Sequence, residues 1–370
     1  MLLCSKCEMD ISSGNCIIPS DEIYFGQSNT LGIGSTSVVH KATRKTDNHK
    51  IGVAVKIYQK ICDKEFSLLK DLDHKNIIKF YGVYKKEPSI GIVMELASDG
   101  DLCKFLATKR QESKAAGILS RLPESQFVQW SIDIASAVQY LHKKCITHKD
   151  IKSLNCLLSD DKENGLNVLK LCDFGISKQS DGTGTVIATS GGCTKRWAAP
   201  EVIKNPTLVC PKSDIYSLSV VLWEAWTCQG PWEGLEEFEM SMNIVNGISL
   251  EIPNDFPEAL RSMIEQCWST ARERRCNIDE VLNYLETFRN ALKDNETPND
   301  SSVSSDEGLK AVSDVRIDGI QQSSCAAVIS EPLGNNKVEV GSLLGNPRKM
   351  KESSTVCKED EENSFDQPDN

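Results

Sequence analysis

Short apolar runs separated by glycine and polar residues occur from Tyr24 to about residue 96. Apolar residues alternate with polar or small ones at 31–39 and 53–56, which is the period of a strand with one buried face. Continuous apolar runs at 77–81 and 90–96 predict two more strands. We therefore expect a β-rich region of short strands and tight turns from residue 24 to residue 96.

Other segments have the hydrophobic period of helices, one of them between these strands and the rest after them. Residues 64–70 carry Glu65 together with Leu68 and Leu69 at helical spacing. Further helices are predicted at 127–142, 214–223 and 278–288. The polar stretch 107–125 predicts a surface insertion between helices, and 160–165 predicts a charged hairpin turn before a strand at 168–171.

The 370 residues exceed what one ordinary core needs, so one large two-lobed unit with an extension, or two domains, would fit. We expect a flexible leader at 1–23, a folded region at 24–290 that divides into lobes at 96/97, and a tail at 291–370. The tail has no hydrophobic period and is rich in Ser, Asp, Glu, Asn and Gly, which is typical of disorder.

The net charge of −11 is concentrated in that tail, where 16 acidic and 8 basic residues contribute −8. The remainder is nearly neutral, which argues against a nucleic-acid or anionic-membrane partner. No apolar run approaches the length of a membrane span. The 15 cysteines are scattered, which favours reduced thiols in the cytoplasm. Cys4, Cys7 and Cys16 could form half of a zinc site, but we favour a flexible leader because no second Cys/His pair follows.

The candidate chemistry centres on the stretch His-Lys-Asp-Ile-Lys-Ser-Leu-Asn at 148–155. Phosphoryl transfer needs a group that takes a proton from the acceptor hydroxyl, a cation near the moving phosphoryl group and a metal ligand. Asp150, Lys152 and Asn155 have the spacing for these three roles. Taken alone, this pattern is common by chance, so its partners elsewhere in the chain decide its meaning.

Those partners occur in the expected order. Gly32 and Gly34 lie in a strand–turn–strand pattern that could lay backbone N–H groups over the phosphates of ATP, although any tight β-turn could look similar. Lys56 ends the next strand and Glu65 lies on the following helix. A solvated ion pair is the alternative, but the glycines before them favour a catalytic pair. Asp173, in Asp-Phe-Gly after an apolar strand, is the predicted second Mg²⁺ ligand.

The rest of the predicted nucleotide site surrounds the junction between the two lobes. The main chain at Glu95 and Ala97 is expected to bond to adenine, with Met94 lining the rear of the pocket. Asp101 could contact the ribose or cap the next helix. Further predicted ATP contacts are Leu31, Ile33, Val39, Ala54 and Leu157. Structural roles are expected for Asp214, which should hold the backbone of the 148–155 loop, and for Glu201, which should pair with Arg274.

Residues 24–290 resemble the eukaryotic protein kinase domain, on the evidence of the motifs quoted above. Segments 76–83, 91–97 and 196–201 are most similar to the tyrosine-kinase-like group, and in particular to mixed-lineage MAP kinase kinase kinases of the type with a leucine zipper and a sterile-alpha-motif domain. Lys152 and Thr194 resemble the serine/threonine pattern. Departures are Lys149 in place of an arginine, Ser37 and Cys193 in place of glycines, and the absence of a leucine heptad after residue 290.

The resemblance implies a bilobal fold, ATP and Mg²⁺, and MAP kinase kinases as substrates. The alternatives are a pseudokinase scaffold, although Lys56, Glu65, Asp150, Asn155 and Asp173 are all present, and a dual-specificity kinase. Residues 176–193 are rich in Ser, Thr and Gly, so we expect phosphorylation to order them, with a transient homodimer for trans-autophosphorylation. The candidates are Ser190, Thr189 and Thr185, with Ser190 favoured.

Overall fold

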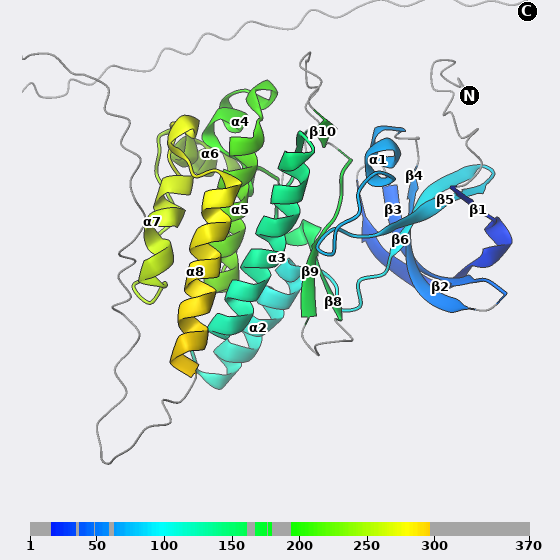
Figure 1. Ribbon diagram of the computed structural model, residues 1–370, viewed down its shortest axis with the longest axis horizontal. Coiled ribbons are helices and arrows are strands. Elements are labelled where there is room, and N and C mark those ends of the chain that lie inside the picture. The colour runs from blue at the N-terminus through cyan, green and yellow to red at the C-terminus, as the bar shows by residue number, and fades with distance from the viewer. Residues whose placement is uncertain are drawn as a thin grey trace, which may run out of the picture. The chain divides into compact units, whose positions relative to one another are not determined.

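The protein is described here from a computed structural model, which places residues 16–34, 37–47, 49–58, 63–160, 167–175, 177–179 and 194–296. All of these belong to one unit of the chain, Met1–Asp318. A β-rich N-lobe and a helical C-lobe lie side by side in it (Figure 1). The predicted α+β, two-lobed architecture is therefore confirmed.

The N-lobe is a six-stranded sheet with the strand order β1-β5-β6-β4-β3-β2, together with one helix, α1. All neighbouring strands are antiparallel except β1 and β5, which are parallel. The elements are β1 (Ile17–Ile18), η1 (Ser20–Glu22), β2 (Ile23–Ile33), β3 (Ser37–Lys45), β4 (Lys50–Tyr58), α1 (Asp63–Leu69), β5 (Phe80–Lys86) and β6 (Ser89–Glu95).

The flexible leader predicted at 1–23 is wrong for its last residues, because Ile17–Ile18 form β1, Ser20–Glu22 form η1 and Ile23 begins β2. The Cys16 carbonyl accepts a hydrogen bond from the Val83 amide at 2.7 Å. Gly82 allows this approach, because a Cβ built there would lie 2.6 Å from the Cys16 oxygen. The strand predicted at 77–81 also begins later, at Phe80. A strand as short as β1 carries no hydrophobic period, which is why the sequence did not indicate it.

The C-lobe is built mainly of helices and carries two small two-stranded sheets on the side that faces the N-lobe (Figure 1). Its first part comprises α2 (Leu102–Ala116), α3 (Glu124–Lys143), β7 (Ile146–Thr147), η2 (Ser153–Asn155), β8 (Cys156–Asp160), β9 (Asn167–Leu171) and β10 (Lys178–Gln179). Its second part comprises η3 (Thr194–Trp197), α4 (Pro200–Lys204), η4 (Pro206–Leu208), α5 (Pro211–Thr227), α6 (Glu237–Val245), α7 (Glu258–Cys267), η5 (Arg272–Arg274) and α8 (Ile278–Glu296).

Helix α2 corrects the expectation of a surface insertion at 107–125. The helix runs to Ala116 and ends at Gly117, whose φ of 68° is the left-handed conformation that glycine adopts readily. Its buried residues are Leu102, Leu106 and Ser113, so most of the surface after residue 106 faces solvent. A polar, exposed helix face has the composition of a loop, and the sequence pattern could not separate the two.

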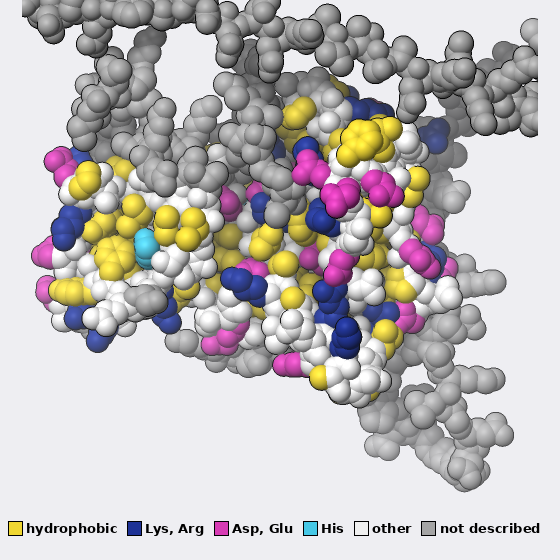
Figure 2. Space-filling view, turned by 180° about the vertical axis from the view of Figure 1, so that it is seen from behind, with side chains coloured by type: hydrophobic (Ala, Val, Ile, Leu, Met, Phe, Trp, Pro, Cys, Tyr) yellow, Lys and Arg dark blue, Asp and Glu magenta, His cyan; other side chains and the backbone are white. Residues whose placement is uncertain are grey.

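Two groups of buried side chains stabilise the fold. The larger is continuous through both lobes: it includes Leu69, Ile77 and Ile92 of the N-lobe and extends through α3 and α5 to α8. The smaller lies within the N-lobe and includes Val53, Val55 and Val93. Beside it the exposed ring of Phe25 packs edge-on against His40, and Figure 2 shows hydrophobic side chains gathered around one histidine on this lobe.

None of the helices described is both long enough and apolar enough to cross a lipid bilayer.

Candidate active site

Lys56 lies at the centre of a set of ion pairs that joins the two lobes. Its Nζ is 2.8 Å from Glu65 Oε1 on α1 and 2.8 Å from Asp173 Oδ1, which follows β9. Strand β4 directs Lys56 to this position because Val55, its neighbour, is buried on the opposite face of the sheet. The three residues that the sequence predicted to act together are therefore in contact.

The charges of Lys56 and Asp173 shift each other's pKa values. Burial alone would lower the pKa of Lys56, but the carboxylates of Asp173 and Glu65 outweigh it and raise that pKa above its ordinary value. Burial would raise the pKa of Asp173, and the Lys56 ammonium instead holds it below its usual range. Lys56 and Asp173 are consequently both charged at neutral pH.

The 148–155 loop brings its three predicted residues together around Asp150. Asp150 Oδ2 accepts hydrogen bonds from Lys152 Nζ at 2.7 Å and from Asn155 Nδ2 at 2.9 Å. Asp150 Oδ1 is buried and has no hydrogen-bond partner among the described residues. A buried carboxylate oxygen without a donor is costly, so this atom is suited to receive the hydroxyl of a substrate.

Buried hydrogen bonds fix the backbone of this loop. Asp214 accepts from the amides of His148 and Lys149, at 2.9 Å each, and its Oδ2 is 3.0 Å from Nε2 of His142. Lys149 has a φ of 72°, a conformation that is strained for a residue with a Cβ. The position predicted for Asp214 agrees with these contacts, which hold the strained turn in place.

The same loop lies against the strand end that carries Asp173. The Asn155 carbonyl accepts from the Cys172 amide at 2.9 Å, and His148 Nε2 lies 3.1 Å from the Cys172 carbonyl. Phe174 packs edge-on against the His148 ring, with ring centroids 5.0 Å apart. Asn155 and Asp173 are thus held on adjacent segments, as a shared metal ion would require.

The predicted nucleotide contacts line the junction of the lobes. Ala54 and Met94 are buried partners on β4 and β6, and the chain continues from Glu95 towards α2. Asp101 caps α2, since its Oδ1 accepts from the Lys104 amide at 2.9 Å, and its contact with the ribose stays a prediction. Leu157 forms an isolated β-bridge with Asp101. In the glycine-rich turn, the Gly34 amide donates to the Ser37 carbonyl at 2.8 Å.

The other predicted contacts lie on the strands next to this turn. Leu31, Gly32 and Ile33 are exposed near the end of β2, with Ile33 80% exposed. Val39 is half-buried on β3 and pairs with both Gly32 and Lys56. Ala97 is half-buried just after β6.

The predicted partner of Glu201 is wrong by one residue. Arg275, fully buried, bonds to both carboxylate oxygens of Glu201 at 2.8 and 2.7 Å. Arg274 is exposed in η5. Neighbouring residues in a tight turn point in different directions, and the run Arg272-Glu273-Arg274-Arg275 contained no signal to decide between them.

Two further polar residues at the site were missed by sequence reasoning. Tyr58 donates a hydrogen bond to Glu65 Oε2 at 2.6 Å. Glu224 of α5 accepts from Ser153 Oγ in the 148–155 loop at 2.7 Å and from Trp197 Nε1 in η3 at 2.9 Å. Neither belongs to a recognisable motif, because each contact depends on how separate elements pack.

Several predicted residues lie outside what the structure describes. These are the phosphorylation candidates Thr185, Thr189 and Ser190, the cysteines Cys4, Cys7 and Cys193, and the tail after residue 296. Thr194 begins η3, but its side chain is also outside the described part.

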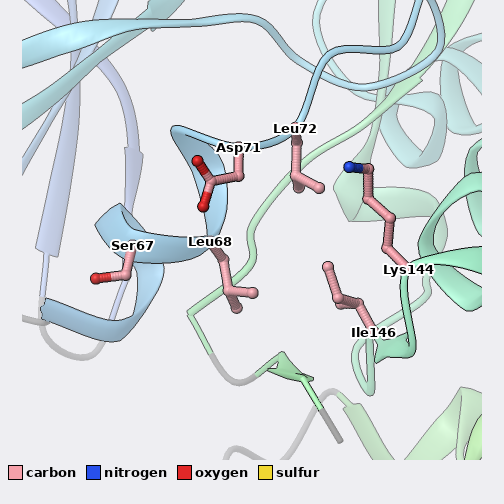
Figure 3. Close-up of a pocket in the computed structure, with 6 residues that line it drawn as sticks. All are labelled: Ser67, Leu68, Asp71, Leu72, Lys144 and Ile146. Atoms are coloured by element: carbon pink, nitrogen blue, oxygen red, sulfur yellow. The ribbon is translucent and has the colours of Figure 1, made fainter.

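A pocket of about 210 Å³ lies beside this site (Figure 3). It is lined by Ser67 and Leu68 of α1, by Asp71 and Leu72, and by Lys144 and Ile146 of the C-lobe. None of the predicted site residues lines it. It is a hollow beside α1, separate from the nucleotide contacts.

Comparison with known proteins agrees with this geometry. The family model described as protein tyrosine and serine/threonine kinase matches residues 25–285. The chain belongs to the protein kinase family. Its kinase domain is similar to "Mitogen-activated protein kinase kinase kinase dlk-1" of Caenorhabditis elegans, at 32% identity over 74% of this chain and 27% of that protein.

Two human proteins, one named as a MAP kinase kinase kinase and one as a tyrosine kinase, are also similar to this chain. "Mitogen-activated protein kinase kinase kinase 11" is 33% identical over 74% of this chain and 31% of its own length. "Tyrosine-protein kinase Fer" is 30% identical over 75% of this chain and 32% of its own length. The chain thus spans about a third or less of these relatives. The resemblance to MAP kinase kinase kinases predicted from the sequence is confirmed, and a tyrosine kinase is similar to nearly the same degree.

Proposed function

We propose that this kinase domain is active and transfers the γ-phosphoryl group of ATP to serine or threonine hydroxyls of protein substrates. The observation that carries the proposal is the contact of Lys56 with both Glu65 and Asp173 at 2.8 Å. A domain that served only as a scaffold would have no need to hold an ammonium between two carboxylates that belong to different lobes.

The residues of the 148–155 loop have complementary roles in the proposed mechanism. Asp150 orients the acceptor hydroxyl with Oδ1 and takes its proton as the new bond forms. Lys152, 2.7 Å from Asp150 Oδ2, neutralises negative charge that develops near this carboxylate. The hydrogen bond from Asn155 Nδ2 to Asp150 Oδ2 keeps the carboxylate from rotating.

The donor set at the site fits Mg²⁺ with a nucleotide. Mg²⁺ takes oxygen ligands and is commonly held by one or two protein groups together with substrate phosphates and water. The Asp173 carboxylate and the Asn155 amide oxygen would hold it, and Lys56 would bind the phosphates. Bound there, the metal would supply positive charge that stabilises the transferring phosphoryl group.

Serine/threonine specificity and MAP kinase kinases as substrates form the finer part of the proposal. They are supported by Lys152, by the resemblance of Thr194 to the serine/threonine pattern, and by relatives named as MAP kinase kinase kinases. The similarity to a tyrosine kinase makes dual specificity the second candidate. We also propose a transient homodimer for trans-autophosphorylation.

The test is phosphate transfer by the full chain, measured with radiolabelled ATP, Mg²⁺ and a panel of MAP kinase kinases. Phosphoamino-acid analysis should give phosphoserine or phosphothreonine, whereas phosphotyrosine would indicate dual specificity. Lys56→Met and Asp150→Asn should each lower the rate by a factor of about 100 or more, because both remove charge from the reacting centre.

The matched control is Lys41→Met, an exposed lysine on β3, which should retain the wild-type rate. Nucleotide binding without any phosphate transfer would favour the pseudokinase scaffold. A Lys56→Met variant with more than a tenth of the wild-type rate would contradict the role proposed for Lys56.

A further inference from the structure

Tyr58, the last residue of β4, contacts the candidate active site through its hydroxyl group. The hydroxyl donates to Glu65 Oε2 at 2.6 Å, while Glu65 Oε1 accepts from Lys56 at 2.8 Å. Lys56 and Tyr58 are two residues apart on one strand, so their side chains project from the same face. The Lys56 Nζ lies 5.5 Å from the centre of the Tyr58 ring.

The Glu65 carboxylate is therefore held at both oxygen atoms. Its side chain is only 2% exposed, so an oxygen without a donor would be costly. Gly175 also lies close to the Glu65 carboxylate, since a Cβ built on Gly175 would lie 3.3 Å from Glu65 Oε2. The carboxylate therefore has little room to move towards Gly175. The direction in which Glu65 faces Lys56 is consequently set by Tyr58 as much as by Lys56 itself.

Helix α1, which carries Glu65, has few other means of holding its position. It is seven residues long, and an isolated helix of that length is unstable in water. Leu69 anchors it in the core and Phe66 packs edge-on against Phe80. Leu68 packs against the core only in part, because it also lines the pocket shown in Figure 3.

We infer that Tyr58 is a positioning residue for phosphoryl transfer, whose hydroxyl holds Glu65 and α1 in the arrangement that keeps Lys56 in place. This inference rests on the function proposed above. The alternative is that the hydroxyl only donates a hydrogen bond to a buried carboxylate and so contributes to the stability of the whole domain. The two differ in what the loss of the hydroxyl changes.

The test compares Tyr58→Phe with the wild-type full chain, because phenylalanine keeps the ring and removes only the donor. We expect kcat to fall about 10-fold, which corresponds to about 1.4 kcal/mol and is typical of a lost hydrogen bond to a charged group. The KM for the protein substrate should not change. Amide hydrogen exchange should become faster in α1 (63–69), while exchange in the C-lobe helices stays as in the wild type.

Two further variants make the comparison decisive. Tyr24→Phe is the matched control, since Tyr24 is a 47% exposed tyrosine of the same sheet, and it should leave both readouts unchanged. In a Glu65→Gln background, Tyr58→Phe should reduce the remaining rate by less than about 2-fold, because residues that act as a unit are not additive. Independent effects would multiply.

The outcomes separate this inference from the proposed function. The inference would be overturned if Tyr58→Phe had the kcat and the α1 amide exchange of the wild type. If Lys56→Met were inactive in the same assay, the proposed function would remain intact. An equal loss of protection in every helix would show a merely structural role and would also overturn the inference. If the wild type transfers no phosphate, the proposed function fails, and faster exchange confined to α1 would still support the hold of Tyr58 on that helix.

Discussion

The carboxyl group of Glu224 is buried between the 148–155 loop and η3, the segment that ends at Trp197. Burial raises its pKa to about 7, although Ser153 and Trp197 both donate hydrogen bonds to it. In the unfolded chain the ordinary value is near 4.5, so the folded protein holds this proton more tightly. The stability that Glu224 contributes is therefore complete below about pH 4.5 and is lost as the pH rises through about 7.

Glu224→Gln should remove this part of the pH dependence, since glutamine imitates the protonated acid. Between pH 4.5 and pH 8 the free energy of unfolding of the wild type should fall relative to that of the variant by about 3 kcal/mol. Urea unfolding at several pH values measures the difference. Glu251→Gln, at an exposed position, is the control. Parallel curves for wild type and Glu224→Gln would mean that Glu224 does not titrate in this range.

Met94 is a second residue whose environment leads to a prediction. It is 8% exposed on β6 opposite Ala54, where it would close the rear of the adenine pocket. Met94→Thr should open that space, so an ATP-competitive inhibitor with a bulky group directed there should bind about 10-fold more tightly or better, as expected when a steric clash is relieved. An analogue without that group should bind both proteins equally. Equal affinities for the bulky compound would contradict this position for Met94.

At the level of elements, the bond between Glu201 of α4 and Arg275 joins two distant parts of the C-lobe. Arg275 also donates to the carbonyl oxygens of Ser269 and Lys212, so its whole guanidinium group is engaged. Arg275→Ala would leave a largely buried carboxylate without its cation, and such changes cost about 3 to 5 kcal/mol.

Thermal or urea unfolding of Arg275→Ala against Arg274→Ala tests this directly. Because Arg274 is exposed, its replacement should change the free energy of unfolding by less than about 0.5 kcal/mol. If the two variants were equally stable, the bidentate pair would not contribute as the geometry indicates.

The sequence predicted elements well where a single strong period or a spaced motif was present. The sequence predicted a strand for Lys56, a helix for Glu65 and loops for Asp150, Asn155 and Asp173. The structure brings these elements together. The sequence did not predict β1, because two residues carry no period, or the true length of α2, because that helix is mostly exposed. Contacts such as Tyr58 to Glu65 could not be predicted, since they depend on where α1 packs against the sheet rather than on residue spacing.

At the scale of the whole described domain, the larger core passes through both lobes without interruption. All six tryptophans belong to the C-lobe, so tryptophan fluorescence reports on that lobe alone. Leu69→Ala, a cavity made in the N-lobe, should lower the fluorescence-detected free energy of unfolding by about 2 to 5 kcal/mol, because the cores unfold together. Circular dichroism should give the same midpoint. A fluorescence transition unchanged by Leu69→Ala would show that the lobes unfold separately.

The continuity of that core also limits how the domain can be recombined with its relatives. A chimaera that exchanged the N-lobe at the natural connection after β6 would divide the core, with Leu69, Ile77 and Ile92 on one side and the α3 residues on the other. Side chains that fit one another would then come from different parents, and a mismatch of even a methyl group in a close-packed interior is destabilising. The unit that can be exchanged intact is the pair of lobes, even though the described part of the chain passes from one to the other at a single connection, after β6.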